Sequence, residues 1–296
     1  MTTIPVAVPR KGRPLEAVLE RVAGLADAEA VADEVASTLR YEKAVTKGRQ
    51  TESRGVYERL AGYSSTDRHA PEFTLLRDGR AGMPRRVVFD SLVVDVGDRE
   101  LHLVGREEPF RALRKHEFAL GFDSADLVLE EVVRLDPEPL SSLAELNERI
   151  DPEDTDVRVT GGLGDRVHHT LLSTPDVSAA PTREFVAAYE GPLCISPRYE
   201  RLVRAVLGTR AMEGVSFRYA GDRKEEAAVA STGLGVYLTV TGSTARDHGL
   251  RVSEELFPSE TVLLENPAEV DGPARELAEV LVDGLEAPPA PSGRNP

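Results

Sequence analysis

The residues best suited to chemistry in this 296-residue chain follow a short apolar run in its last quarter. Val236–Val240 is rich in β-branched and aromatic residues and predicts a buried strand. It leads into Thr241-Gly242-Ser243-Thr244, four small residues able to turn the chain sharply before a short helical turn. Such a strand–loop–helix step can direct N–H groups and hydroxyls at an anion. Threonine, serine and glycine also favour an ordinary turn, so the sequence leaves both interpretations open.

A second strand–loop–helix step opens the chain. Ile4–Val8 predicts a strand, and the loop of residues 9–14 carries Lys11 and Arg13. A helix should follow, because apolar residues recur at helical spacing from Leu15 onward. The two cations can meet an anion at this helix start, or they can be solvated loop charges.

Other reactive residue types give weaker signals. His168 and His169 are adjacent within a strand pattern, so their side chains should face opposite ways and form a poor metal chelate. Cys194 is the single cysteine, which excludes an internal disulfide and indicates a reducing compartment. We expect it to be a small buried hydrophobe, and we expect no metal site built by the protein alone.

Composition excludes several classes of protein. The formal net charge of −15 argues against nonspecific nucleic-acid binding, and no apolar run approaches the length of a membrane span. The first ten residues lack the layout of a signal peptide. We therefore expect a cytoplasmic protein that binds neither nucleic acid nor membrane.

The elements that must position these residues alternate between strand and helix, which predicts an α/β fold with largely parallel sheets. At this length two lobes are expected. Lobe 1 should comprise residues 1–135 and 250–286, with a surface insertion at about 42–86 where apolar periodicity fades. Lobe 2 should comprise 155–247, after an acidic, proline-containing linker at 136–156. Residues 287–296 should be a disordered tail.

Five segments in chain order carry a family resemblance. They are Val6–Glu16, Arg106–Pro109, Leu120–Leu127, Leu193–Arg204 and Thr241–Leu250. Their motifs resemble those of the ATP phosphoribosyltransferases of histidine biosynthesis, in the short form. The resemblance implies a two-lobed fold of the periplasmic-binding-protein type (type II), with a cleft between lobes.

The resemblance also implies a function. A phosphoribosyltransferase of this family joins phosphoribosyl diphosphate to ATP and releases pyrophosphate, with Mg²⁺ carried by the substrates. Thr241, Gly242, Ser243 and Thr244 would bind phosphoribosyl diphosphate. The nucleotide-binding positions would be Lys11, Gly12, Arg13, Arg106, Asp123 and Ser124. No catalytic residue is assigned, and a homo-oligomer with a separate regulatory subunit is the implied assembly.

Departures from the family motif at Tyr237, at Gly233 and at Asp123-Ser124, where the family carries Thr-Gly, keep other functions open. Tyr237 and Gly233 stand where the family carries aspartate, and a glutamate at 225 or 226 lies near a family glutamate. The alternatives are transfer to a different acceptor, or a non-catalytic two-lobed protein that binds a small anion or acts as a regulator. If the loop serves a ligand, we expect Gly242→Val to abolish binding without lowering the thermal midpoint.

Overall fold

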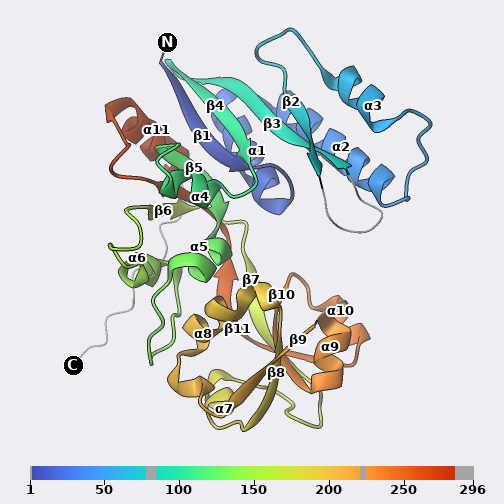
Figure 1. Ribbon diagram of the computed structural model, residues 1–296, viewed down its shortest axis with the longest axis vertical. Coiled ribbons are helices and arrows are strands. Elements are labelled where there is room, and N and C mark those ends of the chain that lie inside the picture. The colour runs from blue at the N-terminus through green and yellow to red at the C-terminus, as the bar shows by residue number, and fades with distance from the viewer. Residues whose placement is uncertain (1, 78–84, 221–224, 284–296) are drawn as a thin grey trace. The chain divides into compact units, whose positions relative to one another are not determined.

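The computed structural model describes residues 2–77, 85–220 and 225–283 (Figure 1). The described chain divides into two compact units. Unit 1 contains residues up to 123 together with 156–163 and the segment from 261 onward, and unit 2 contains 124–155 and 164–260. The predicted tail at 287–296 lies outside the described residues. Among those described, no helix is long and apolar enough to cross a membrane.

Unit 1 is built on a seven-stranded sheet in the order β2-β3-β4-β1-β5-β12-β6. Its strands are β1 (Thr3–Pro9), β2 (Glu72–Arg77), β3 (Arg85–Val96), β4 (Arg99–Arg106), β5 (Leu120–Ser124), β6 (Arg158–Gly162) and β12 (Thr261–Glu265). The first strand is parallel to both β4 and β5, whereas β3 and β4 form an antiparallel hairpin joined by Gly97-Asp98. The sheet is therefore mixed, not largely parallel as expected.

The helices of unit 1 are α1 (Arg13–Ala26), α2 (Glu29–Thr46), α3 (Val56–Tyr63), α4 (Pro109–Arg114) and α11 (Gly272–Val282). The predicted apolar face of α1 is buried, with Leu15 and Val18 fully covered. These residues share one core with β1 and with Leu277 of α11. Burial of this shared face holds the start of α1 at the end of β1.

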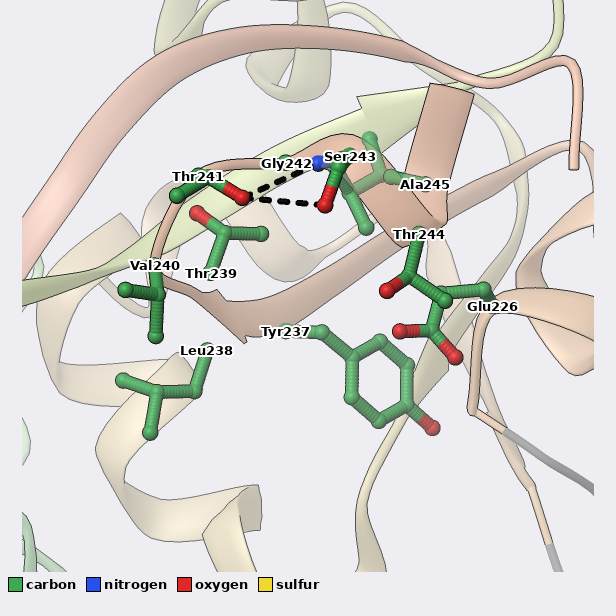
Figure 2. Close-up of a pocket in the computed structure, with 11 residues that line it drawn as sticks. Glu226, Tyr237, Leu238, Thr239, Val240, Thr241, Gly242, Ser243, Thr244 and Ala245 are labelled. Atoms are coloured by element: carbon green, nitrogen blue, oxygen red, sulfur yellow. Dashed lines mark hydrogen bonds between the residues drawn. The ribbon is translucent and has the colours of Figure 1, made fainter. Parts of the chain in front are cut away.

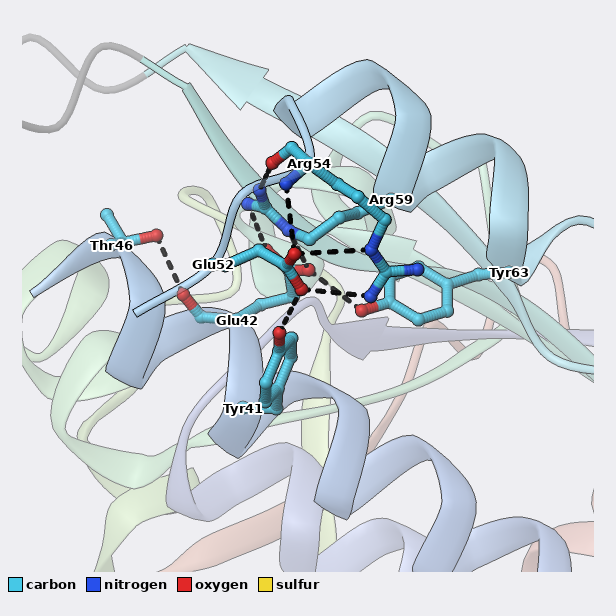
Figure 3. A network of polar contacts seen from close by, with 7 residues as sticks. All are labelled: Tyr41, Glu42, Thr46, Glu52, Arg54, Arg59 and Tyr63. Atoms are coloured by element: carbon cyan, nitrogen blue, oxygen red, sulfur yellow. Dashed lines mark hydrogen bonds and ion pairs between the residues drawn. The ribbon is translucent and has the colours of Figure 1, made fainter. Parts of the chain in front are cut away.

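The segment at 42–86 is not the surface insertion that we expected. It contains α3 and β2, and β2 pairs with β3 in the main sheet. Figure 3 shows how α3 is fastened to α2: Arg59 Nε and Nη2 lie 2.7 and 2.9 Å from the two carboxylate oxygens of Glu42. Tyr63 donates a third hydrogen bond to Glu42, at 2.8 Å. Polar contacts thus attach α3 to α2. Because these contacts need few apolar residues, the sequence lacks the apolar periodicity that would have indicated a packed segment.

Unit 2 is built on a five-stranded sheet in the order β11-β7-β10-β8-β9. Its strands are β7 (Val167–Ser173), β8 (Gly191–Ile195), β9 (Val215–Tyr219), β10 (Leu234–Thr239) and β11 (Arg251–Ser259). Its helices are α5 (Ala125–Val132), α6 (Leu146–Arg149), α7 (Arg183–Ala187), α8 (Glu200–Leu207), α9 (Glu225–Thr232) and α10 (Ser243–Asp247). The central strand β10 is antiparallel to β7 and parallel to β8.

The two units confirm a mixed α/β protein with two sheets, but their ranges differ from the expected lobes. Residues 124–135 and 250–260 belong to unit 2, where we had placed them in lobe 1. The expected linker at 136–156 is largely part of unit 2 and buries Leu140, Leu143 and Leu146. Prolines and acidic residues flank these leucines on both sides, which concealed the apolar side of the segment.

Candidate functional site

The loop at 241–244 follows the carboxyl end of β10, as predicted, and leads directly into α10. Thr241 Oγ1 and Ser243 Oγ are 3.0 Å apart, and the Ser243 N–H donates to Thr241 Oγ1 at 3.4 Å (Figure 2). Arg246 Nη1 donates to the Thr241 carbonyl at 3.0 Å. The side chains of the loop therefore hold its own turn in place.

Several donors of the loop remain available. Within the part of the chain that the structure describes, the backbone N–H groups of Gly242, Thr244 and Ala245 have no acceptor. Thr241, Ser243 and Thr244 are exposed to solvent. They line a pocket of about 210 Å³ together with Leu172, Glu226 and the run 237–245. This combination of free N–H groups and hydroxyls suits an anion such as a phosphate.

Gly242 corrects one expectation. Its φ of 65° is left-handed, and a Cβ built on it would lie 2.9 Å from Val252 Cγ2. Glycine is therefore required by the backbone and by packing within unit 2, whether or not a ligand binds. The expectation that Gly242→Val leaves the thermal midpoint unchanged is wrong, since that substitution strains the fold itself.

Tyr237 occupies the position at which the family motif has aspartate. Only 4% of its surface is exposed, and its hydroxyl lies 3.7 Å from Cys194 Sγ. Burial raises the pKa of Tyr237 above its ordinary value, so the phenol stays neutral. In Figure 2 its hydroxyl points away from the loop. Tyr237 thus supplies no negative charge to the pocket.

Glu226 provides a carboxylate in the same pocket as the loop. It lies in the first turn of α9, and Figure 2 draws it on the side of the pocket that Thr244 also lines. The sequence left the choice between Glu225 and Glu226 open, because the match to the family motif could shift by one residue. Of the two, Glu226 is the one that lines this pocket.

The predicted nucleotide-binding residues of unit 1 gather at the carboxyl ends of three neighbouring strands. Lys11, Gly12 and Arg13 follow β1. Arg106 is the last residue of β4 and pairs with Pro9, the last residue of β1. Lys11 Nζ lies 3.0 Å from Glu107, and the Arg106 guanidinium lies 4.8 Å from the Phe118 ring centre. Lys11 is therefore already paired.

Asp123 and Ser124 are placed differently from the basic residues. Asp123 is the penultimate residue of β5 and is only 3% exposed, and its Oδ2 accepts the Phe110 N–H at 3.0 Å. This contact anchors the start of α4, so Asp123 has a structural task that the sequence did not reveal. Ser124 precedes α5 and belongs to unit 2.

The two histidines face opposite ways, which confirms the expected strand alternation. His169 is buried with its Nε2 3.2 Å from Asp126 Oδ2, whereas His168 lies 3.4 Å from Glu255. Across the described residues, no three histidine, cysteine or acidic side chains come close enough together to hold a metal ion.

Fold and loop together define a two-unit α/β protein in which a loop of small residues connects strand β10 to the short helix α10. The chain belongs to the family described as halobacterial ATP phosphoribosyltransferase, which it matches over residues 1–288. No curated protein matches it significantly.

Solved structures show distant similarity. The ATP phosphoribosyl transferase (HisG:HisZ) complex from Thermotoga maritima is 14% identical, with 94% of this chain and 96% of that chain covered and a TM-score of 0.40. YhfZ from Shigella flexneri is 11% identical, with 96% and 85% covered and a TM-score of 0.45. The ligand-binding component of an ABC-type import system from Staphylococcus aureus, with zinc bound, is 10% identical, with 95% and 72% covered and a TM-score of 0.38.

Proposed function

We propose that the protein transfers the phosphoribosyl group of phosphoribosyl diphosphate to ATP. A ring nitrogen of adenine forms a bond to C1 of the ribose while the bond from C1 to the pyrophosphate oxygen breaks. Pyrophosphate leaves with the bonding electron pair. Positive charge develops on the ribose as in glycoside chemistry, so the reaction needs phosphate contacts and positioning more than covalent help.

The observation that carries this proposal is the loop at 241–244 in a member of this family. Its exposed hydroxyls and unpaired N–H groups suit the 5′-phosphate of phosphoribosyl diphosphate. The α10 helix has only five residues, so its dipole contributes little and individual hydrogen bonds must carry the binding.

Glu226 takes the acidic role in this proposal. The family motif places that charge on the strand before the loop, where this chain has the buried Tyr237. Glu226 reaches the same pocket from α9 and can accept hydrogen bonds from ribose hydroxyls or from water bound to a metal ion. Mg²⁺ carried by the substrates would neutralise the leaving pyrophosphate. A single carboxylate suits an ion that keeps most of its waters.

In unit 1, the proposed contacts to the nucleotide phosphates are Lys11, Gly12, Arg13 and Arg106. Lys11 must then exchange Glu107 for a phosphate. That exchange costs little, because both side chains of the pair are substantially exposed and such pairs contribute about 0–1 kcal/mol. Ser124 stays a candidate at the start of α5, whereas buried Asp123 would act through α4.

The proposed assembly is a homo-oligomer that works with a regulatory subunit. Its support is family membership, together with the HisG:HisZ complex named among the similar structures. The structure describes one chain, so sedimentation of the purified protein with and without a candidate subunit is the measurement that decides.

Pyrophosphate release tests the reaction. The wild-type protein should release pyrophosphate from phosphoribosyl diphosphate with ATP and Mg²⁺, and Thr244→Ala should slow it. Ser216→Ala removes an exposed hydroxyl outside the pocket and serves as the control. Turnover with another base but not with ATP would show that the protein uses a different acceptor. Binding of phosphoribosyl diphosphate without any turnover would select the non-catalytic function, which the replacement of aspartate by Tyr237 favours.

A further inference from the structure

Two exposed apolar side chains stand beside the loop. Leu238 is 38% exposed and Val240 is 79% exposed, which is high for large apolar residues. Both line the pocket of the 241–244 loop, and Figure 2 shows their side chains extending to the same side of the chain. Apolar side chains that are exposed side by side at a pocket are candidates for contact with a ligand.

The ends of the neighbouring strands explain this exposure. Pairing of β10 with β8 ends at Val236, and pairing with β7 ends at Thr239. The Thr239 side chain points to the other side, where its hydroxyl lies 2.6 Å from Thr170 Oγ1. Strand alternation therefore presents Leu238 and Val240 together as one apolar wall at the pocket.

The polar parts of the pocket lie apart from this wall. The loop supplies hydroxyls and N–H groups, and Glu226 supplies negative charge. Phosphates and sugar hydroxyls would be desolvated without compensation against Leu238 and Val240. Of the groups carried by the two proposed substrates, only the purine ring presents a flat apolar face.

We propose that Leu238 and Val240 contact the purine ring of the nucleotide acceptor and favour it over acceptors without such a face. This assignment rests on the proposed function and identifies one side of its acceptor site. Contact with the ring covers the exposed parts of both side chains, which is favourable in proportion to the apolar area removed from water.

The test compares Val240→Thr with Val280→Thr, using the wild-type protein as reference. Threonine keeps the β-branched shape of valine but replaces one methyl by a hydroxyl, so the Val240 side of the apolar wall becomes polar with little change of shape. Val280 is exposed on α11 of unit 1 and serves as the matched control. The readouts are the KM for ATP, the Kd for phosphoribosyl diphosphate, and inhibition by tripolyphosphate, which has the phosphates of ATP without its ring.

Val240→Thr should raise the KM for ATP by about tenfold, the scale of losing one apolar contact in a binding pocket. The Kd for phosphoribosyl diphosphate, inhibition by tripolyphosphate and the thermal midpoint should match those of wild type and Val280→Thr. An unchanged KM for ATP overturns the assignment, as does an equal loss for all three ligands, which would mean that Val240 only supports the loop. If wild type itself neither binds phosphoribosyl diphosphate nor releases pyrophosphate, the proposed function falls and the assignment falls with it.

Discussion

Gly242 offers the sharpest test of how the loop is built. Gly242→Ala forces an alanine into a backbone with φ of 65°, which costs about 1–2 kcal/mol relative to glycine. The new Cβ would also lie 2.9 Å from Val252 Cγ2, a side chain packed against the core of unit 2. Overpacking of this kind adds about 1–3 kcal/mol. We expect the free energy of unfolding to fall by about 2–5 kcal/mol in total.

Gly249 provides the matched control. Its φ of 73° is also left-handed, but a Cβ at this position has nothing within 4 Å. Gly249→Ala should therefore show the backbone cost alone, about 1–2 kcal/mol. Urea unfolding followed by circular dichroism measures both variants, and the difference between them isolates the contact with Val252.

The double variant Gly242→Ala/Val252→Ala completes the design, with Val252→Ala measured alone. Removing the valine side chain should relieve the contact, so the two substitutions together should cost less than the sum of their separate effects. Equal stability of Gly242→Ala and Gly249→Ala, or strict additivity in the cycle, would refute the packing argument for Gly242.

Three further predictions concern binding, packing and charge. Thr244→Ala should weaken binding of phosphoribosyl diphosphate by about 1–2 kcal/mol, the scale of one hydrogen bond to a charged group, and calorimetric titration would contradict this by showing equal affinity. Arg59→Met should lower the free energy of unfolding by about 3–5 kcal/mol because it strands the buried Glu42 carboxylate, whereas Glu42→Met/Arg59→Met should recover most of it in urea melts. Raising KCl from about 0.1 to 1 M should raise the thermal midpoint, because the net charge of −15 repels itself until screened; a falling midpoint would count against this.

Sequence patterns predicted the parts of the fold whose signals are local. The run before the loop became β10, and the apolar face of α1 was buried as its spacing indicated. The apolar pattern of residues 197–207 predicts a helix, and the structure has a short 3₁₀ turn followed by α8 there. Residues 185–196 resemble a strand in sequence, but the first of them belong to helix α7, whose start Thr182 caps by accepting the Phe185 N–H. The actual strand begins only at Gly191.

The parts that escaped prediction depend on contacts between distant residues. From the sequence, Glu42 and Arg59 are expected to be surface charges. They form a buried ion pair only because α2 and α3 pack against each other. The sequence did not show which of Glu225 and Glu226 lies near the loop, because that depends on how α9 is oriented against β10. The loop residues themselves were found because their types and order are local properties, but the exposed wall beside them depends on where the neighbouring strands end.

The buried cysteine of unit 2 can be used to measure how often that unit opens. Cys194 is the single thiol of the chain and is 1% exposed beside Tyr237, and burial raises the pKa of the thiol. A disulfide reagent reacts with the thiolate, so labelling of this covered sulfur is slow in the folded unit and is favoured when β8 and its neighbours open. The rate of thiol exchange therefore reports on transient opening of unit 2. A ligand held by the 241–244 loop should slow that rate, which makes one chemical reaction a measure of both stability and occupancy.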